Sequence, residues 1–479
     1  MMHLSEAAMA TQGKLIGRDV LFTSVGTDSR KLAAGQLFVA LRGIHFDGHD
    51  YAVKALAEGA VAVMVSASVP GVTAAIEVAD TRLALGELAA HWRRKFAIPL
   101  AAITGSNGKT TVKEMLAAIL RAQVAQELQA QDAATLGEGV YDAAAVSPQA
   151  MQAVLATEGN LNNDIGLPLT LLKLRDQHRY AVAEMGMNHR GEIRYLSHIG
   201  APTVALVNNA GTAHIGELGS VEAIAQAKGE IFEGLAPDGV AVINADDAYA
   251  PLWQALAAPR KVATFGLDVP ADVTAEYRLA QDHSVIAMKT PIGEITFDLP
   301  SPGLHNVRNA LAAATAALAM GASLTAVGHG LAHFSGAKGR LQTKAGAHGA
   351  TVIDDSYNAN PASVRAAIDV LAAHEGKRLL VLGDMGELGE DAASMHAEIG
   401  AYAREAGIDG LYALGELSRH TVTAFGTGAS LHEGPEALAA ALDKIMRPDT
   451  VVLVKGSRFM KMERVVARIA NDNTSGEAH

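Results

Sequence analysis

The stretch Thr104-Gly105-Ser106-Asn107-Gly108-Lys109-Thr110-Thr111 constrains the fold more than any other part of the chain. An apolar run at residues 100–103 precedes it and indicates a buried strand. The apolar residues that follow it recur with the spacing of one helix face: Val112, Met115, Leu116, Ile119 and Leu120. A strand, a Gly-containing turn and a helix in direct succession predict one unit of an α/β protein.

The chemistry of this turn favours a phosphate site. Gly105 and Gly108 allow the backbone to approach an anion, and the unpaired N–H groups of the helix point toward it. Lys109 is expected to place positive charge on the terminal phosphates, and the Thr110 hydroxyl to reach Mg²⁺. The strict P-loop pattern requires a glycine where Ile103 stands, so this is a shortened variant. The alternative is an ordinary turn between a strand and a helix. The presence of Gly-Lys-Thr at this junction favours the phosphate site over that alternative.

Composition narrows the class of protein. The 479 residues suggest about three domains. A net charge of −12 argues against a nucleic-acid binder, which usually carries a basic surface. The chain contains no cysteine, which excludes disulfides and thiol catalysis. No segment approaches the roughly 20 apolar residues of a membrane span, and the N-terminus has no signal-peptide layout. We therefore expect a cytoplasmic protein without a membrane span.

The order of predicted elements indicates an α/β fold in three domains with boundaries at 1–97, 98–327 and 328–479. The first is a small α/β domain. Its strands are expected at 20–25, 36–40, 60–65 and 74–78, and its helices at 51–58 and 83–96. The second has a mostly parallel sheet. Its strands are expected at 100–103, 180–183, 203–207 and 240–243, and its helices at 221–235 and 307–320. The third is a doubly wound, Rossmann-like unit with these expected strands: 351–353, 379–382, 410–414 and 451–454. An Ala- and Gln-rich segment, 124–153, is interpreted as a partly helical surface insertion.

Three polar residues after the phosphate loop are candidates for chemistry. Glu184 directly follows the strand at 180–183, so its carboxylate emerges at the edge where open α/β sheets bind ligands and suits Mg²⁺. His214 follows the strand at 203–207 at the same edge, although a lone histidine is as often structural. Lys228 lies inside a helix that Ser220 is placed to cap, and composition alone makes it a solvated helix position.

Taken together, these motifs resemble the Mur ligase family, ATP-dependent amide ligases of peptidoglycan synthesis. The resemblance covers nearly the whole chain and depends on these runs: 27–30, 37–43, 104–111, 159–168, 184–189, 210–214, 227–232, 339–340, 354–360, 383–389 and 454–458. The runs Asp-Ser-Tyr-Asn-Ala-Asn and Gly-Asp-Met-Gly-Glu-Leu-Gly are the most specific, because they are typical of members that add D-alanyl-D-alanine. Lys338 departs from the pattern, which has proline there.

The resemblance implies a reaction and its partners. ATP phosphorylates the terminal carboxylate of UDP-N-acetylmuramoyl-tripeptide, and the amine of D-alanyl-D-alanine attacks the resulting acyl phosphate. Such a ligase releases ADP and serves cell-wall biogenesis, and through it cell shape and division. No nucleic-acid partner is implied. A monomer is expected, although the sequence itself carries no signal for oligomeric state.

The resemblance also implies roles for individual residues. Catalytic roles fall on Lys109, His214 and Lys228. Two Mg²⁺ ions are expected near Thr110, Glu184, His214 and Lys228, with Lys228 carbamylated so that it carries negative charge. ATP contacts are expected from Gly105, Ser106, Asn107, Gly108, Lys109, Thr110, Thr111, Asn306, Arg340 and Asp355. UDP-sugar contacts are expected from Ser29, Arg30, Asn160 and Asn163. Asn358 and Asn360 are candidates for the dipeptide or nucleotide side of the third domain.

Three alternatives compete with this hypothesis. A sibling ligase that adds the third residue to the UDP-muramoyl-dipeptide carries an Asp-Asn-Pro-Arg run, which does not occur here. Folylpolyglutamate synthase shares the loop but lacks the hundred-residue domain before it. A nucleotide-binding regulatory module would not require Lys109, Glu184, His214 and Lys228 to be intact. The sequence does not distinguish diaminopimelate from lysine at the third position of the acceptor peptide.

Overall fold

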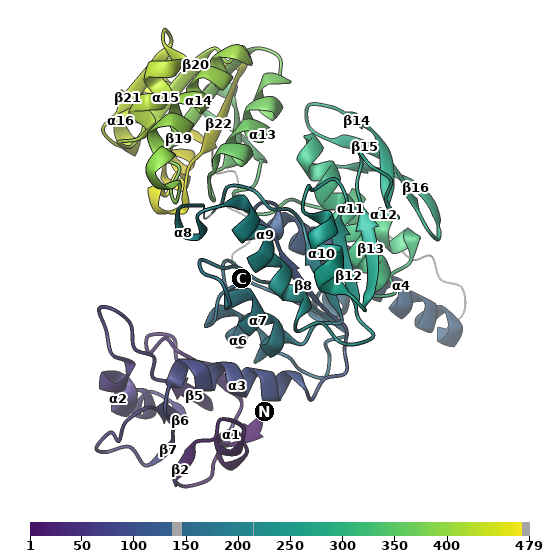
Figure 1. Cartoon of the computed structure of the whole chain (residues 1–479). Coiled ribbons are helices and arrows are strands. Elements are labelled where there is room, and N and C mark those ends of the chain that lie inside the picture. The colour runs from purple at the N-terminus through teal and green to yellow at the C-terminus, as the bar shows by residue number, and fades with distance from the viewer. Residues whose placement is uncertain (137–145, 214, 472–479) are drawn as a thin grey trace.

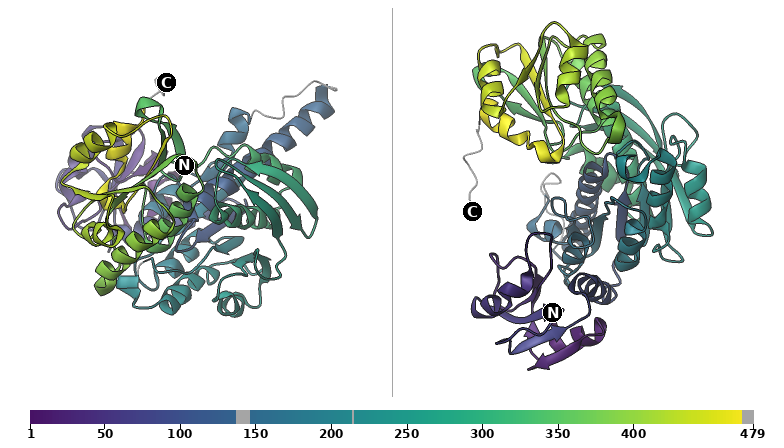
Figure 2. Two further views of the ribbon diagram at one scale, coloured as in Figure 1. Left: turned by 90° about the horizontal axis from the view of Figure 1, so that it is seen from above. Right: turned by 60° about the vertical axis from the view of Figure 1, so that its left-hand side comes forward.

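Three α/β units follow one another along the chain in the computed structural model, which describes residues 1–136, 146–213 and 215–471. The N-terminal and C-terminal units lie at opposite ends of the central unit (Figure 1; Figure 2, right). The predicted α/β class, with mostly parallel sheets, is confirmed. The exact boundaries predicted at 97/98 and 327/328 stay a prediction.

The N-terminal unit contains a five-stranded sheet. Its strand order is β2 (Lys14–Gly17), β7 (Ala74–Glu77), β6 (Ala60–Val65), β5 (Gln36–Val39) and β4 (Ser24–Gly26). Its other elements are β1 (Met2–His3), β3 (Leu21–Phe22), α1 (Leu4–Ala10), η1 (Gly48–Tyr51), α2 (Ala52–Ala57) and α3 (Thr81–Arg93). The predicted elements are present, except that the single strand predicted at 20–25 is divided into β3, which pairs with β1, and β4 of the five-stranded sheet. Helix α1 and the antiparallel strand β2 were not predicted, because both are short and weakly patterned.

Helix α3 attaches this unit to the centre. The Asp80 side chain caps it by accepting hydrogen bonds from the backbone N–H groups of Arg82 and Leu83. Near its end, Trp92 Nε1 donates to the carbonyl of Leu174 at 3.1 Å. At its start, Arg82 Nη1 lies 2.6 Å from Asp164 Oδ2. These contacts join the first unit to the central one at both ends of the helix.

The central sheet is entirely parallel. Its order is β13 (Lys261–Phe265), β12 (Val240–Asn244), β11 (Val204–Val207), β8 (Leu100–Thr104), β10 (Tyr180–Glu184) and β9 (Val154–Ala156). Its strands are continuous apolar runs because helices cover both faces. The helices of the central unit are α4 (Lys109–Leu136), α5 (Pro148–Gln152), α6 (Gly166–Leu171), α7 (Glu192–Gly200), α8 (Ile215–Leu218), α9 (Val221–Gly229), η2 (Glu230–Phe232), α10 (Ala250–Ala257), α11 (Leu304–Ala319) and α12 (Leu324–Ala332).

The connections reverse direction at β8. The chain passes from β8 to β9 and β10 on one side, and then to β11 and β12 on the other. A crevice opens at such a switch point outside the carboxyl ends of the strands, and it is the usual ligand site of open α/β sheets. The phosphate loop directly follows β8, so the topology places it in this crevice.

Two parts of the central unit differ from the prediction. A three-stranded antiparallel sheet of β14 (Thr274–Leu279), β15 (Ser284–Thr290) and β16 (Gly293–Leu299) packs against α12 and was missed. The segment 124–153 is helical on both sides of residues 137–145, which lie outside the described residues, but the expected surface position is wrong for Val124 and Ala150, which are buried. A glutamine of this segment also holds the start of α12, because Gln126 Oε1 accepts a hydrogen bond from Ser323 Oγ at 3.0 Å.

The C-terminal unit has a six-stranded sheet with one antiparallel edge strand, β17. Its order is β17 (Gln342–Ala345), β18 (Thr351–Asp355), β22 (Thr450–Lys455), β19 (Lys377–Gly383), β20 (Gly410–Leu414) and β21 (Ala429–His432). Its helices are η3 (Ala347–Gly349), α13 (Pro361–Ala372), η4 (Gly389–Asp391), α14 (Ala392–Glu405), α15 (Ser418–Phe425), α16 (Pro435–Asp443), η5 (Arg458–Met460) and α17 (Glu463–Ile469). All four predicted strands of this unit are confirmed.

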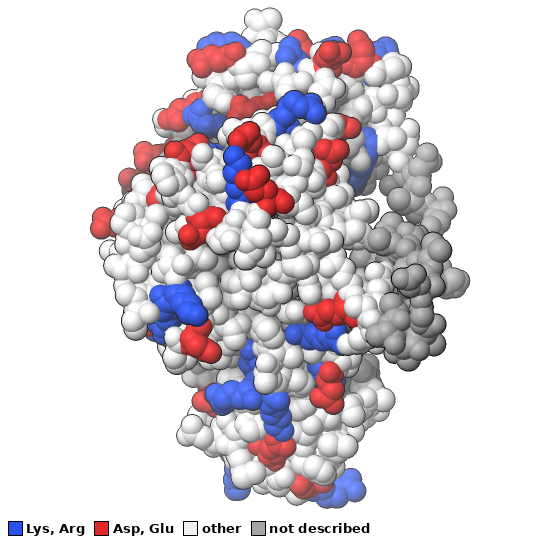
Figure 3. Space-filling model, turned by 90° about the vertical axis from the view of Figure 1, so that its right-hand side faces the viewer, with Lys and Arg blue, Asp and Glu red and all other residues white. Residues whose placement is uncertain are grey.

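The surface shows mixed charge on the face drawn in Figure 3. Acidic and basic side chains alternate there and do not gather into a basic stripe. None of the described helices has the length and apolar content needed to cross a lipid bilayer.

Candidate active site

The phosphate loop lies between β8 and α4, as the sequence predicts. Gly108 has φ +81°, in the left-handed region that favours glycine. A Cβ there would lie 2.3 Å from Asn309 Oδ1 and 2.5 Å from Asn208 Nδ2. The loop therefore depends on glycine both for its backbone conformation and for its close approach to neighbouring amides.

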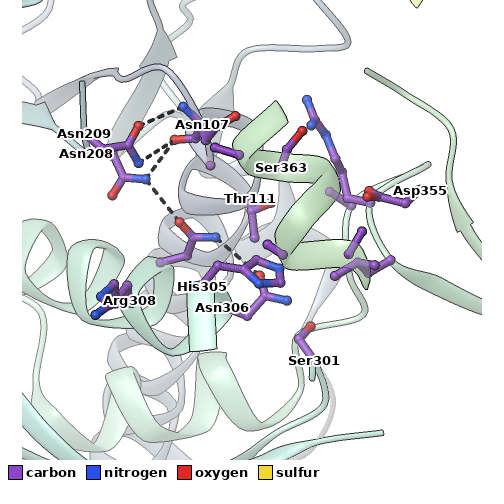
Figure 4. Close-up of a pocket in the computed structure, with 18 of the residues that line it drawn as sticks. Asn107, Thr111, Asn208, Asn209, Ser301, His305, Asn306, Arg308, Asp355 and Ser363 are labelled. Atoms are coloured by element: carbon purple, nitrogen blue, oxygen red, sulfur yellow. Dashed lines mark hydrogen bonds between the residues drawn. The ribbon is translucent and has the colours of Figure 1, made fainter. Parts of the chain in front are cut away.

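A chain of asparagines holds the loop in place (Figure 4). The Asn107 backbone N–H donates to Asn209 Oδ1 at 2.8 Å, and Asn208 Nδ2 donates to the Asn107 carbonyl at 2.9 Å. Asn208 Nδ2 also donates to Asn309 Oδ1 at 3.1 Å, and Asn309 Nδ2 donates to Asn306 Oδ1 at 3.3 Å. The network links β11 and α11 to the loop without using charge. Of these, Asn208, Asn209 and Asn309 were missed, although the i, i+3 spacing of Asn309 from Asn306 places both on one helix face.

Lys109 folds back over its own loop. Its Nζ donates to the Gly105 carbonyl at 2.7 Å. Burial lowers the pKa of its ammonium; Arg340 lowers it further, whereas the carboxylates of Glu184 and Glu387 act in the opposite direction. The ammonium is therefore held beside the loop by a backbone carbonyl, a contact that a phosphate oxygen can replace.

Glu184 is the best-ordered candidate metal ligand among the described residues. It is 3% exposed at the end of β10, where Thr110 Oγ1 donates to its Oε2 at 2.9 Å and Asn162 Nδ2 donates to its Oε1 at 2.8 Å. Its backbone N–H donates to Thr157 Oγ1 at 3.0 Å. Neutral donors thus orient the carboxylate without neutralising it, which suits a divalent cation. Asn162 and Thr157 were not predicted, although Asn162 lies inside the 159–168 run.

The other predicted metal positions differ in how far the structure describes them. His214 lies outside the described residues. Within the described part of the chain, no three histidine or acidic side chains form a cluster that could hold a metal ion. The described candidates are therefore Glu184, Thr110 and Lys228.

Lys228 is buried, so its interpretation as a solvated helix position is wrong. It is 1% exposed near the end of α9, a helix whose predicted cap is confirmed by the 3.1 Å hydrogen bond from the Ala223 N–H to Ser220 Oγ. Burial lowers the pKa of Lys228 well below its ordinary value, and the positive charge of Lys109 lowers it further. No acidic side chain among the described residues forms an ion pair with it. These conditions favour the neutral amine.

A cavity of about 260 Å³ lies between the central and C-terminal units. It is lined by these predicted ATP residues: Asn107, Gly108, Thr111, Asn306, Arg340 and Asp355. Figure 4 shows Asn107, Asn306 and Asp355 around one space, although they come from the loop, α11 and β18. The structure therefore brings together residues separated by up to 248 positions in the chain, from Asn107 to Asp355.

The C-terminal wall of this cavity is charged and ordered. Lys455 Nζ lies 2.6 Å from Asp355 Oδ2, and both side chains are buried. The Arg340 guanidinium lies 4.4 Å from the centre of the Tyr357 ring, and its buried Nε has no hydrogen-bond partner among the described residues. Burial lowers the pKa of His305, at the edge of the same cavity, to about 4. Neither Lys455 nor His305 was predicted.

A second cavity, of about 550 Å³, adjoins the other side of the phosphate loop. Lys109 and Thr110 line it from the loop, and Asn358 and Asn360 line it from the C-terminal unit. Asn360 caps α13 by accepting from the Ser363 N–H at 2.9 Å, and its Nδ2 donates to Asn107 Oδ1 at 2.7 Å. The C-terminal unit thus contacts the phosphate loop directly.

The predicted UDP-sugar residues lie outside both cavities. Arg30 Nε lies 2.9 Å from Asp28 Oδ1 in an exposed turn, and this contact lowers the pKa of Asp28 to about 2. Asn163 Oδ1 accepts from the Gly166 N–H at 2.8 Å at the start of α6. The predicted substrate contacts of Ser29, Arg30, Asn160 and Asn163 therefore stay predictions.

Three segments match one family. Residues 21–93 match the Mur ligase family catalytic domain, residues 103–317 the Mur ligase middle domain, and residues 339–458 the Mur ligase glutamate ligase domain. The chain belongs to the Mur ligase family. This result confirms the resemblance found in the sequence, and the Mur ligase matches extend over all three α/β units.

Individual relatives agree with this assignment over nearly the full length. The chain is 41% identical over 475 residues to the UDP-N-acetylmuramoyl-tripeptide–D-alanyl-D-alanine ligase of Escherichia coli, covering 98% of this chain and 99% of that one. It resembles the crystal structure of MurF from Acinetobacter baumannii with a TM-score of 0.85 and 36% identity, covering 97% of each chain. It also resembles MurF from Thermotoga maritima in complex with ADP, with a TM-score of 0.80 and 26% identity, covering 94% of this Mur ligase and 98% of that one.

Proposed function

We propose that this Mur ligase is an ATP-dependent, ADP-forming amide ligase that joins D-alanyl-D-alanine to UDP-N-acetylmuramoyl-tripeptide. The observation that carries the ligase activity is the cavity in which Arg340 and Asp355 of the C-terminal unit meet the phosphate loop. The substrates are those in the name of the Escherichia coli relative, with which the chain shares 41% identity. The working compartment is the cytoplasm, where ATP is available.

The residues divide the reaction between the two cavities. Asn306, Arg340 and Asp355 hold the base and ribose of ATP, and the loop from Gly105 to Thr111 cradles its phosphates. Lys109 leaves the Gly105 carbonyl and binds the transferring phosphoryl group, stabilising the charge that develops as the tripeptide carboxylate attacks it. The dipeptide amine then attacks the acyl phosphate carbon, and the tetrahedral intermediate expels inorganic phosphate. The 550 Å³ cavity is the space in which the acyl phosphate and the dipeptide meet.

We assign the metal site from the ligand chemistry of its side chains. Thr110 and Glu184 offer hard oxygen ligands, and His214 and Lys228 complete the predicted set for two Mg²⁺ ions. The neutral amine that burial favours at Lys228 can attack CO₂ and lose a proton, giving a carbamate with two acceptor oxygens. Mg²⁺ bound there supplies charge neutralisation for the ATP phosphates.

The remaining assignments follow from the same proposal. The N-terminal unit, residues 1–97, binds the UDP-sugar through Ser29 and Arg30, with Asn160 and Asn163 from the central unit. Residues 98–327 form the ATP-binding domain, and residues 328–479 form the domain that receives the dipeptide.

Phosphate release tests this function. The purified chain is supplied with ATP and D-alanyl-D-alanine, and either UDP-muramoyl-tripeptide or UDP-muramoyl-dipeptide. We expect phosphate release and a ligated product with the tripeptide alone. Equal turnover when the dipeptide is offered with a free third amino acid would instead establish the sibling reaction.

A further inference from the structure

Two loops of the C-terminal unit place opposite charges around the 550 Å³ cavity. Glu387 lies in the loop that follows β19, and Arg458, Phe459 and Lys461 lie in the loop that follows β22. All four side chains are exposed, and they line the cavity together with Lys109. Both loops belong to sequence runs that the proposed function leaves without a role.

The backbone of these loops is strained at the charged residues. Glu387 has φ +61° and Lys461 has φ +51°, in the left-handed region that residues other than glycine rarely adopt. Such conformations persist only where the surrounding structure enforces them, and they cluster at ligand sites. The two strained residues line the same cavity, which is a second reason to assign it a ligand.

The loops are also fixed to each other. The Gly386 N–H donates to Ser457 Oγ at 2.7 Å, and the Ser457 N–H donates to the Asp384 carbonyl at 3.0 Å. On the far side, the Gly216 N–H of α8 donates to the Glu387 carbonyl at 3.3 Å. The spacing between the acidic and the basic side chains is therefore set by the fold.

The two charges have different neighbours. Glu387 contacts the central unit through its carbonyl, which accepts a hydrogen bond from the Gly216 N–H of α8, and its carboxylate raises the pKa of Lys109 on the phosphate loop. Arg458 donates through Nη1 to Glu463 Oε1 at 2.9 Å and packs 5.7 Å from the Tyr357 ring. A guanidinium has five N–H donors, so one contact leaves others able to bind a second carboxylate.

We infer that Glu387 binds the ammonium group of the dipeptide acceptor, and that Arg458 and Lys461 bind its carboxylate. This inference rests on the proposed function, because it assigns the orientation of the substrate in the same site. The ammonium end points toward the phosphate loop, where the acyl phosphate forms, and Phe459 contacts the methyl groups. A zwitterion matches this arrangement of charges, whereas an acceptor without one of its two charges does not.

The carboxylate half is tested with the carboxamide of D-alanyl-D-alanine, which lacks only the negative charge. The wild-type KM for the carboxamide is expected to be about ten- to a hundredfold above that for the acid. In Arg458→Met/Lys461→Met the two KM values converge to within about threefold, while the KM for ATP is unchanged. Arg458→Met alone gives an intermediate ratio. Arg468→Met, whose arginine pairs with Glu436 on the same unit, is the control and keeps the wild-type ratio.

The ammonium half is tested with Glu387→Gln. We expect its KM for D-alanyl-D-alanine to rise about tenfold, while inhibition by propionyl-D-alanine, which lacks the amine, stays equal to wild type. Glu390→Gln removes the same charge from a residue of the same loop that does not line the cavity, and it keeps wild-type kinetics. An equal loss for both compounds, or a wild-type enzyme that does not distinguish the acid from the carboxamide, overturns the inference. Absence of wild-type ligation with D-alanyl-D-alanine would instead overturn the proposed function.

Discussion

Lys228 of the central unit and Lys455 of the C-terminal unit are both 1% exposed, yet their surroundings differ. Lys455 Nζ lies 2.6 Å from Asp355 Oδ2 and donates to the Asn358 carbonyl at 2.9 Å. Lys228 has no acidic partner among the described residues and has Lys109 as a neighbour of like charge. Burial lowers the pKa of both amines, but Asp355 opposes this effect only at Lys455.

The difference separates two tasks. A buried charge without a partner is energetically costly. The central unit contains buried polar groups that gain a charged partner only when a ligand binds. Lys228 and the oriented carboxylate of Glu184 are such groups. A buried ion pair is complete before any ligand arrives, and in the C-terminal unit it fixes the wall on which the nucleotide rests. Substitutions in the central unit should therefore affect catalysis, and substitutions of the pair should affect stability.

Lys109→Ala is the most damaging change expected for turnover. It removes the charge that faces the transferring phosphoryl group, so kcat should fall about a thousandfold, or about 4 kcal/mol of transition-state stabilisation. The melting temperature should change little. A variant with near-normal phosphate release would remove the phosphate-loop assignment.

Lys228→Ala should lose roughly a hundredfold or more of activity, because a negative carbamate beside Mg²⁺ is replaced by a methyl group. Added acetate should restore part of the rate by supplying a carboxylate in the vacated space. Lys109→Ala is the control, since a variant that has lost a cation gains nothing from an anion. A largely active Lys228→Ala enzyme, together with an unmodified amine by mass spectrometry of the wild type, would contradict the carbamate.

The two lysines can be compared directly by urea unfolding in CO₂-depleted, Mg²⁺-free buffer. Lys455→Met leaves Asp355 buried without a partner, so the free energy of unfolding should fall by about 3–5 kcal/mol. Lys228→Met removes an unpaired buried amine and should leave stability unchanged or raise it by about 1 kcal/mol. Equal losses in the two variants would show that the contrast between the units has no energetic basis.

The sequence identifies most of the residues that differ between the two units, but it does not identify their partners in space. The strand–loop–helix order placed Lys109 and Glu184 near one sheet edge, whereas Lys228 was assigned to the same site only through the family resemblance. Periodicity assigns residues to faces, but it does not show which side chains meet across space. The pairing of Lys455 with Asp355, which lie 100 positions apart, has no local signal in the sequence, and the hydrogen bond from Asn162 to Glu184 has none either.

The antiparallel sheet of β14 to β16 was missed for a different reason. Its strands are largely exposed on one face, and β14 carries mostly exposed residues, so its apolar pattern is weak. The first part of the 124–153 segment was misplaced because alanine-rich helices pack closely without large apolar side chains, and Val124 is buried in this way.

His305 provides a pH-dependent test at the boundary between the two units. Its folded-state pKa is about 4 because of burial, compared with 6.5 ordinarily. Between these values the unfolded chain binds a proton that the folded chain does not, so stability is lost as pH falls from 6.5 toward 4, by at most about 3 kcal/mol. His305→Gln should flatten the pH dependence of urea unfolding in that window. An identical slope in the two proteins would contradict the burial of the imidazole.

Asn360 joins the two regions, and the smallest effects are expected there. Its Oδ1 caps α13 through the Ser363 N–H, and its Nδ2 donates to Asn107 Oδ1 in the phosphate loop. Asn360→Asp keeps an acceptor for the cap but has no donor for Asn107. We expect its stability to stay within about 0.5 kcal/mol of wild type, while the KM for ATP rises a few-fold.

Asn360→Ala removes both contacts, so it should show the same rise in KM and an additional loss of about 1 kcal/mol in the free energy of unfolding. The two variants therefore separate the stability of the C-terminal unit from its contact with the loop. If Asn360→Asp has the wild-type KM for ATP, the Asn360 side chain caps α13 but does not contribute to ATP binding. The docking of the C-terminal unit on the loop would then depend on the residues of the nucleotide cavity, Arg340 and Asp355, rather than on this hydrogen bond.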